Sequence, residues 1–93
     1  MPPDMAFPGG SAYAMVRDIS EGYLLVTERT FKMFTRPDLE QLGFEFDRLL
    51  RELRAEQPDL DNHPELQKKQ RKLQRVNTAL VVLRAFRAKQ NRG

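Results

Sequence analysis

The chain has no cysteine, no tryptophan and only one histidine among its 93 residues. The absence of cysteine excludes disulfide bonds, thiolate catalysis and cysteine-ligated zinc. No apolar run reaches the roughly 18 residues that a membrane span requires, and residues 1–10 lack the basic and then apolar pattern of a secretory signal. We therefore expect no membrane association and a location in the cytoplasm, or in the nucleus if the source is eukaryotic.

Hydrophobic residues make up 40% of the chain and charged residues 31%, a balance typical of helices with one buried and one solvated face. A chain of this length can build only one modest core. Because disulfides are excluded, self-association is the remaining way to bury more surface, and a homodimer is predicted.

The net charge of +3 conceals an uneven distribution of charge. Residues 1–63 contain 7 basic and 12 acidic side chains, a net charge of −5, whereas residues 64–93 contain 9 basic side chains and one acid, a net charge of +8. The sequence therefore predicts a mildly acidic body joined to a strongly basic C-terminal segment.

Residues 1–10 hold three of the six prolines and two of the five glycines, so we predict a flexible arm there. Residues 11–93 are predicted to form a single helical domain. Its first helix is predicted over 12–34, because apolar positions from Val16 onward recur every three or four residues. A β-hairpin over 22–34 is the alternative, since this stretch is rich in β-formers and Gly22 weakens a helix by about 1 kcal/mol.

Two further helices have clear start signals. Thr35 and Pro37 predict a helix over 37–56, and Asn62 and Pro64 predict one over 63–89. A leucine-rich stripe with helical spacing follows each start. Its members are Leu39, Leu42, Phe46, Leu49 and Leu53 in the first helix, and Leu66, Leu73, Val76 and Leu80 in the second. The fold class predicted is all-α, an antiparallel helical hairpin with an additional N-terminal helix.

Residues 79–83, followed by Phe86, are apolar around nearly the whole circumference of the last predicted helix. A two-helix hairpin cannot cover such a ring, so either the N-terminal segment or a second copy of the chain must do so. Together with the surplus apolar residue Phe44, this ring favours a bundle completed by oligomerisation. We predict a partner-binding set that consists of Phe44, Val82, Leu83 and Phe86.

Catalytic chemistry has little support in the sequence. His63 is the only histidine and follows a capping residue at the start of a helix, a position that local structure explains. The acids Asp59, Asp61 and Glu65 alternate around it but lack the central glycine and distal glutamate of a calcium loop. We therefore expect no enzyme, metal, cofactor or small-molecule substrate.

The basic run in the last helix is the most distinctive charged feature. A helix places most of this run on one face, as phosphate contacts would require, and we predict a nucleic-acid-binding set as the alternative function. That set consists of Lys68, Lys69, Arg71, Lys72 and Arg75. The competing interpretation is a solvated face that is partly neutralised by acids of the preceding helix, namely Glu40, Glu45, Asp47, Glu52 and Glu56.

The leading functional prediction is a non-catalytic helical interaction module, an adaptor or assembly subunit. Such a module recognises a partner helix or a second copy of itself through packed apolar stripes. Nucleic-acid binding through the basic helix is the alternative.

Overall fold

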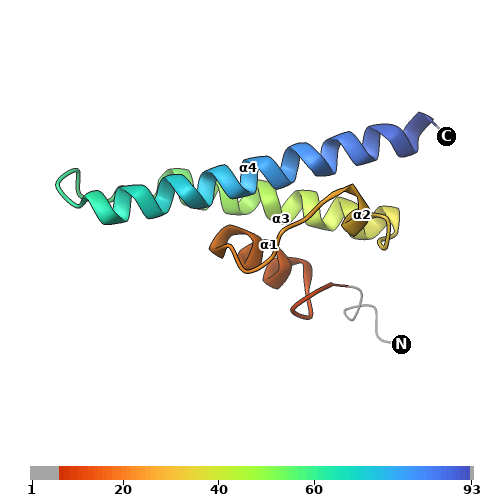
Figure 1. Cartoon of the computed structure of the whole chain (residues 1–93), viewed down its shortest axis with the longest axis horizontal. Helices are drawn as coiled ribbons and strands as arrows, with labels where there is room; N and C mark the ends of the chain where they lie inside the picture. Colours follow the sequence, from red (N-terminus) through yellow and green to blue (C-terminus); the bar gives the residue numbers. More distant parts are fainter. Residues whose placement is uncertain (1–6, 93) are drawn as a thin grey trace.

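The computed structural model describes residues 7–92, and their side chains as far as Asn91. Four helices follow one another along the chain: α1 (Ala12–Glu21), α2 (Glu28–Phe31), α3 (Arg36–Ala55) and α4 (His63–Arg92). Residues 7–92 contain no strand, so the all-α prediction is confirmed. Helices α3 and α4 lie antiparallel, and α1 and α2 cover one side of this pair (Figure 1).

The starts of the two long helices are fixed by the capping residues that the sequence indicates. The Thr35 hydroxyl accepts from the Asp38 amide at 3.3 Å, and the Asp38 carboxylate accepts from the Thr35 amide at 3.1 Å. Asn62 Oδ1 accepts from the Glu65 amide at 3.3 Å. Each bond pairs a backbone amide that would otherwise have no partner at a helix N-terminus, which explains why α3 and α4 begin where they do.

The helix predicted over 12–34 ends at Glu21, and the reason is Gly22. This glycine adopts a left-handed backbone with φ of 85°, and its amide donates to the carbonyls of Asp18 and Ile19. The Tyr23 amide also donates to Asp18 O, at 2.9 Å. Such a glycine closes a helix because it reaches this conformation without the steric cost of a Cβ. The prediction of one continuous helix over 12–34 was therefore wrong, because Gly22 terminates the helix instead of only weakening it.

The alternative of a β-hairpin over 22–34 was wrong as well. Residues 24–27 are extended, but they lead into the short helix α2, and no strand pairs with them among residues 7–92. Leu24 and Val26 pack against the core, whereas Leu25 between them is 87% exposed. The β-forming residues thus produce an extended connection whose side chains alternate between the core and the solvent.

The predicted flexible arm over 1–10 falls largely outside the described residues, which begin at Phe7. Phe7 itself is buried, and its ring stacks on that of Phe34 with centroids 5.3 Å apart. The Gly10 amide donates to Phe7 O at 3.0 Å. The described end of this segment is therefore a turn that packs on the core.

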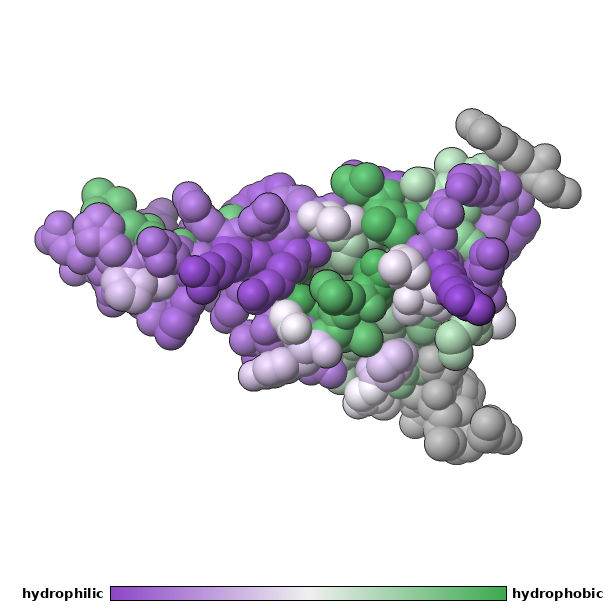
Figure 2. Space-filling view, in the orientation of Figure 1, coloured by the Kyte–Doolittle hydropathy of each residue, from purple (hydrophilic) through white to green (hydrophobic). Residues whose placement is uncertain are grey.

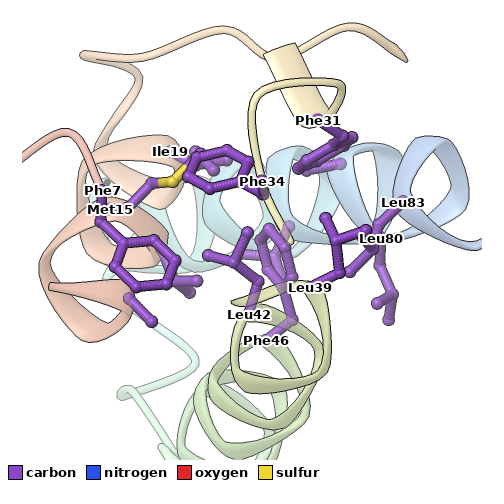
Figure 3. Close-up of a cluster of buried hydrophobic side chains, with 14 of the residues drawn as sticks. Phe7, Met15, Ile19, Phe31, Phe34, Leu39, Leu42, Phe46, Leu80 and Leu83 are labelled. Carbon is purple, nitrogen blue, oxygen red and sulfur yellow. The ribbon is translucent and has the colours of Figure 1, made fainter. Parts of the chain in front are cut away.

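The core lies between the α3–α4 pair and the N-terminal elements (Figure 3). The predicted leucine-rich stripe of α3 is buried apart from Leu49, which is only partly buried. Leu50, which is not a member of that stripe, is also buried, with 5% exposure. In α4, Val76 and Leu80 are buried, whereas Leu66 and Leu73 are partly buried. The buried face of α3 is therefore wider than the predicted stripe, because it also includes Leu50.

Most of the apolar ring of α4 is covered within the same chain, whereas Val81 is 63% exposed. Leu83 is 1% exposed and Phe86 is 8% exposed. Phe31 of α2 is fully buried, and its ring centroid lies 6.3 Å from that of Phe86. The sequence left two ways to cover this ring, the N-terminal segment or a second copy of the chain. In the structure, the N-terminal segment packs against it through Phe31.

The molecule is elongated, because α4 is much longer than its neighbours. Its radius of gyration is 14.3 Å, whereas a compact chain of this length would have about 12 Å. A helix of 30 residues extends about 45 Å, close to the longest dimension of 49 Å. Helix α4 therefore offers more surface than the shorter helices can cover. No helix in the described part of the chain has the length and hydropathy needed to cross a membrane.

Candidate protein-binding surface

Several large apolar side chains are exposed in the described part of the chain. They are Tyr13, Tyr23, Leu25, Met33, Phe44, Leu60 and Val81. Single exposed apolar residues are ordinary on protein surfaces, whereas a contiguous group indicates a binding surface.

One such group forms around Leu25. A groove of about 210 Å³ runs between residues 24–26 and α4, and Ile19 and Ala79 contribute to its lining. Thr78 lines the groove from α4, and Val81 and Val82 follow it on the same side of the helix by three and four residues. Figure 2 shows hydrophobic surface over the middle of α4 and over the connection between α1 and α2. We call this group the Leu25 patch; it consists of Leu24, Leu25, Val26, Thr78, Val81 and Val82.

The predicted partner-binding residues are divided between three environments. Val82 is partly buried and belongs to the Leu25 patch. Phe44 is 59% exposed but faces a separate hollow of about 290 Å³ between α3 and α4, which Arg84 and Arg87 also line. Leu83 and Phe86 are buried by α2 and the rest of the core, so neither offers surface to a second chain. Their assignment as partner-binding residues is corrected accordingly.

Leu25, Tyr23 and Val81 are exposed apolar residues that the predicted partner-binding set lacked. The set missed Leu25 because residues 12–34 were assigned to one helix, in which Leu25 has no special position. The signal that identifies it is the run of β-formers from Tyr23 to Thr27. An extended segment turns alternate side chains to opposite sides, so packing of Leu24 and Val26 leaves Leu25 outside.

The basic run of α4 is held mainly by contacts inside the chain. Lys72 Nζ lies 3.2 Å from Glu21 Oε1, and Lys68 Nζ lies 3.4 Å from Glu65 Oε1. Arg75 Nη1 donates to the Ser20 carbonyl at 3.0 Å, where it stabilises the C-terminus of α1. Lys69 donates to the Glu56 carbonyl. Of the five predicted nucleic-acid-binding residues, Arg71 is the one whose side chain makes no hydrogen bond or ion pair within residues 7–91.

None of the acids of α3 forms an ion pair with this run in the described part of the chain, although Glu56 lines the same hollow as Lys68 and Lys69. Glu45 and Glu52 pair with Arg48 inside α3, at 3.8 and 3.4 Å. Glu40 pairs with Arg87, which lies beyond the basic run. The antiparallel register explains this arrangement, because it sets the start of α3 against the end of α4.

The loop around His63 has the structure of a turn. Asp59 accepts from the Asp61 amide at 3.0 Å through its carboxylate, and from the Asn62 amide at 2.9 Å through its carbonyl. His63 is exposed at the first position of α4. Within residues 7–92, no three histidine, cysteine or acidic side chains are grouped as metal ligands would be.

A second charged cluster lies on the side of α1 that faces α3. The guanidinium carbons of Arg17 and Arg48 lie 5.5 and 5.7 Å from the centroid of the Tyr13 ring. Arg17 Nη1 donates to Tyr13 Oη at 2.7 Å, and this hydrogen bond raises the pKa of the Arg17 guanidinium above its ordinary value. The cluster attaches α1 to α3 through cation–π contacts.

Comparisons of the sequence with protein-family models and with curated proteins, and of the fold with solved structures, give no match.

Proposed function

We propose that the chain is a non-catalytic interaction module, an adaptor or assembly subunit that binds a protein partner through the Leu25 patch. The observation that supports this proposal is the 87% exposure of Leu25 next to an apolar groove. Burying a leucine of this kind contributes about 1.5–3 kcal/mol, so a partner that covers the patch gains several kilocalories per mole. A partner helix or a second copy of the chain would supply this cover.

The backbone that carries Leu25 is held in place by its neighbours, which favours binding. Leu24 and Val26 hold the exposed segment against the core, and Gly22 and α2 fix its two ends. A preformed apolar surface loses little conformational entropy when a partner binds. Leu25 is therefore presented in a defined position and need not be ordered by the partner.

Photo-crosslinking tests this proposal in the cells that produce the protein. A benzophenone amino acid at position 25 is compared with the same group at position 60, since Leu25 and Leu60 are exposed to a similar degree, 87% and 80%. Leu60 lies in the α3–α4 loop, away from the groove lining. We expect a discrete adduct with another polypeptide, or with a second copy, from position 25 only. Equal crosslinking from both positions, or none from position 25, would refute the proposal.

Nucleic-acid binding is the second candidate function. The observation that favours it is that Lys68 and Arg71 are exposed three residues apart on α4. Lys68 lines a hollow of about 310 Å³ with Lys69 and Lys72, and Glu56 and Glu65 also line it. Phosphate binding by this face requires these cations to act together.

Heparin chromatography of two charge-reversed variants tests this candidate. The first changes Lys68 and Arg71 to glutamate, and the matched control changes Arg51 and Arg54, an exposed pair with the same spacing on α3. Phosphate binding by α4 predicts that only the first variant elutes at much lower salt. Equal shifts would show that net charge alone controls retention and would end this candidate.

A further inference from the structure

We infer that the occupant of the Leu25 patch is an amphipathic helix of another protein with acidic residues flanking its apolar stripe. This inference rests on the proposed function and specifies the partner's chemistry.

The shape of the surface next to the groove suits a helix. Along α4, one line of exposed and uncharged residues repeats at intervals of four and three: Gln74, Thr78, Val81, Ala85 and Ala88. This is the spacing at which one helix presents a continuous edge to another. Small residues at the far end of the line allow the axis of a second helix to approach within the usual 8–10 Å. The groove beside Thr78 then receives one large apolar side chain from that helix.

Cationic side chains border this line. Arg71 precedes it on the same side of α4, and Arg75 lines the groove itself. Arg84 follows Val81 by three residues and is exposed, with no ion pair among the described side chains. A docked helix would therefore have these guanidinium groups within reach of its own flanks.

The acids near the two ends of the patch are already paired with lysines of α4. Glu21 pairs with Lys72 at 3.2 Å, and Glu28 pairs with Lys89 at 2.8 Å. Around the patch, the side chains of Arg71 and Arg84 then have no ion pair among the described residues, whereas Arg75 is bound to the Ser20 carbonyl. Figure 2 shows hydrophilic surface on both sides of the hydrophobic area along the length of the molecule. An acidic partner complements this arrangement, whereas a basic partner would be repelled.

The same charge argues against a second copy of the chain as the occupant. A twofold interface uses the same patch on both subunits, so it would place α4 against α4. Both copies would then bring Arg71, Arg75 and Arg84 to the contact, and no acid of residues 7–91 forms an ion pair with these side chains. The apolar line is too narrow to separate the two sets of cations, because Arg75 and Arg84 lie within one helical turn of it.

A peptide-display selection tests the partner's chemistry directly. A random library of 16-residue peptides is selected on the full chain and counter-selected on the double variant Leu25→Asp, Val81→Asp. Both changes are at exposed positions, so the variant retains its fold, which circular dichroism verifies. A second counter-selection on Leu60→Asp is the matched control and should remove nothing.

The expected result is a set of enriched peptides with apolar residues at positions i, i+3 or i+4, and i+7, and with a net negative charge. Their binding should weaken at least tenfold when their acids become lysines, and it should weaken as salt rises. Enriched peptides that are neutral or basic, or that have apolar residues at every second position, would overturn the acidic helix but keep the proposed function. Enriched peptides that bind the Leu25→Asp, Val81→Asp variant as well as the parent chain would overturn both the acidic helix and the proposed function. Sedimentation that shows a dimer dependent on Leu25 would keep the proposed function and overturn this inference.

Discussion

At the scale of single residues, Gly22 and Gly43 differ in how they affect the stability of their helices. Gly22 has a left-handed backbone, and a Cβ built on it would lie 3.0 Å from Arg75 Cζ. Gly43 lies inside α3, and a Cβ there would meet its nearest atoms at 3.8 and 3.9 Å, which are ordinary contacts. The first glycine is required by conformation, whereas the second only weakens its helix.

We expect Gly22→Ala to lower the free energy of unfolding by about 1–2 kcal/mol, because an L-residue is disfavoured in the left-handed region. Gly43→Ala is the matched control and should raise the free energy of unfolding by about 0.5–1 kcal/mol. Urea denaturation of both variants measures the difference. A neutral or stabilising Gly22→Ala would contradict the assignment of Gly22 as the end of α1.

Residue-level prediction from sequence was successful where a single side chain acts on its own backbone. Thr35 and Asn62 cap their helices as expected, because a cap depends on a few neighbouring residues. The partial burial of Leu49 was not predictable in the same way. Leu49 lies beside Tyr13 and Val16 of α1, a helix from a distant part of the sequence.

At the scale of the elements, α2 illustrates how tertiary contacts sustain local structure. A helix of four residues has no stability of its own in water. Its position is held by Phe31, which is fully buried, and by the Lys89–Glu28 ion pair of 2.8 Å to α4. The ion pair is largely exposed and contributes at most about 1 kcal/mol, so the aromatic contact dominates.

We expect Phe31→Ala to lower the free energy of unfolding by about 3–5 kcal/mol, because it opens a cavity over Phe86. Met33 lies two residues away and is 79% exposed. Met33→Ala should therefore change the free energy of unfolding by less than about 0.5 kcal/mol. Thermal unfolding followed by circular dichroism distinguishes the two. Similar small losses for both variants would show that α2 does not cover the α4 ring.

The same element explains why part of the binding surface was misassigned from sequence. The apolar ring of α4 was identified correctly, but the sequence could not decide what covers it. Phe31 and Phe86 are separated by 55 positions, and no periodicity links them. Leu83 and Phe86 are therefore core residues, whereas Val81 on the opposite side of the helix remains 63% exposed.

At the scale of the whole molecule, the described residues of one chain form a continuous core. Buried side chains from all four helices meet in a single cluster, and each of α1, α3 and α4 packs against the other two. Within the Leu25 patch, Leu25, Thr78 and Val81 lie outside this cluster and contribute little to folding, whereas Leu24, Val26 and Val82 pack against it. Stability and partner binding are thus assigned to different residues of the same helix α4.

The measurement that tests this account most directly is the midpoint of thermal unfolding across a hundredfold dilution of the purified chain. A core completed by a second copy makes the midpoint depend on concentration, because association stabilises the folded state by mass action. The account predicts that the midpoint stays constant. A midpoint that falls steadily on dilution would show that the chain needs a second copy to cover α4, and it would contradict the core described for a single chain.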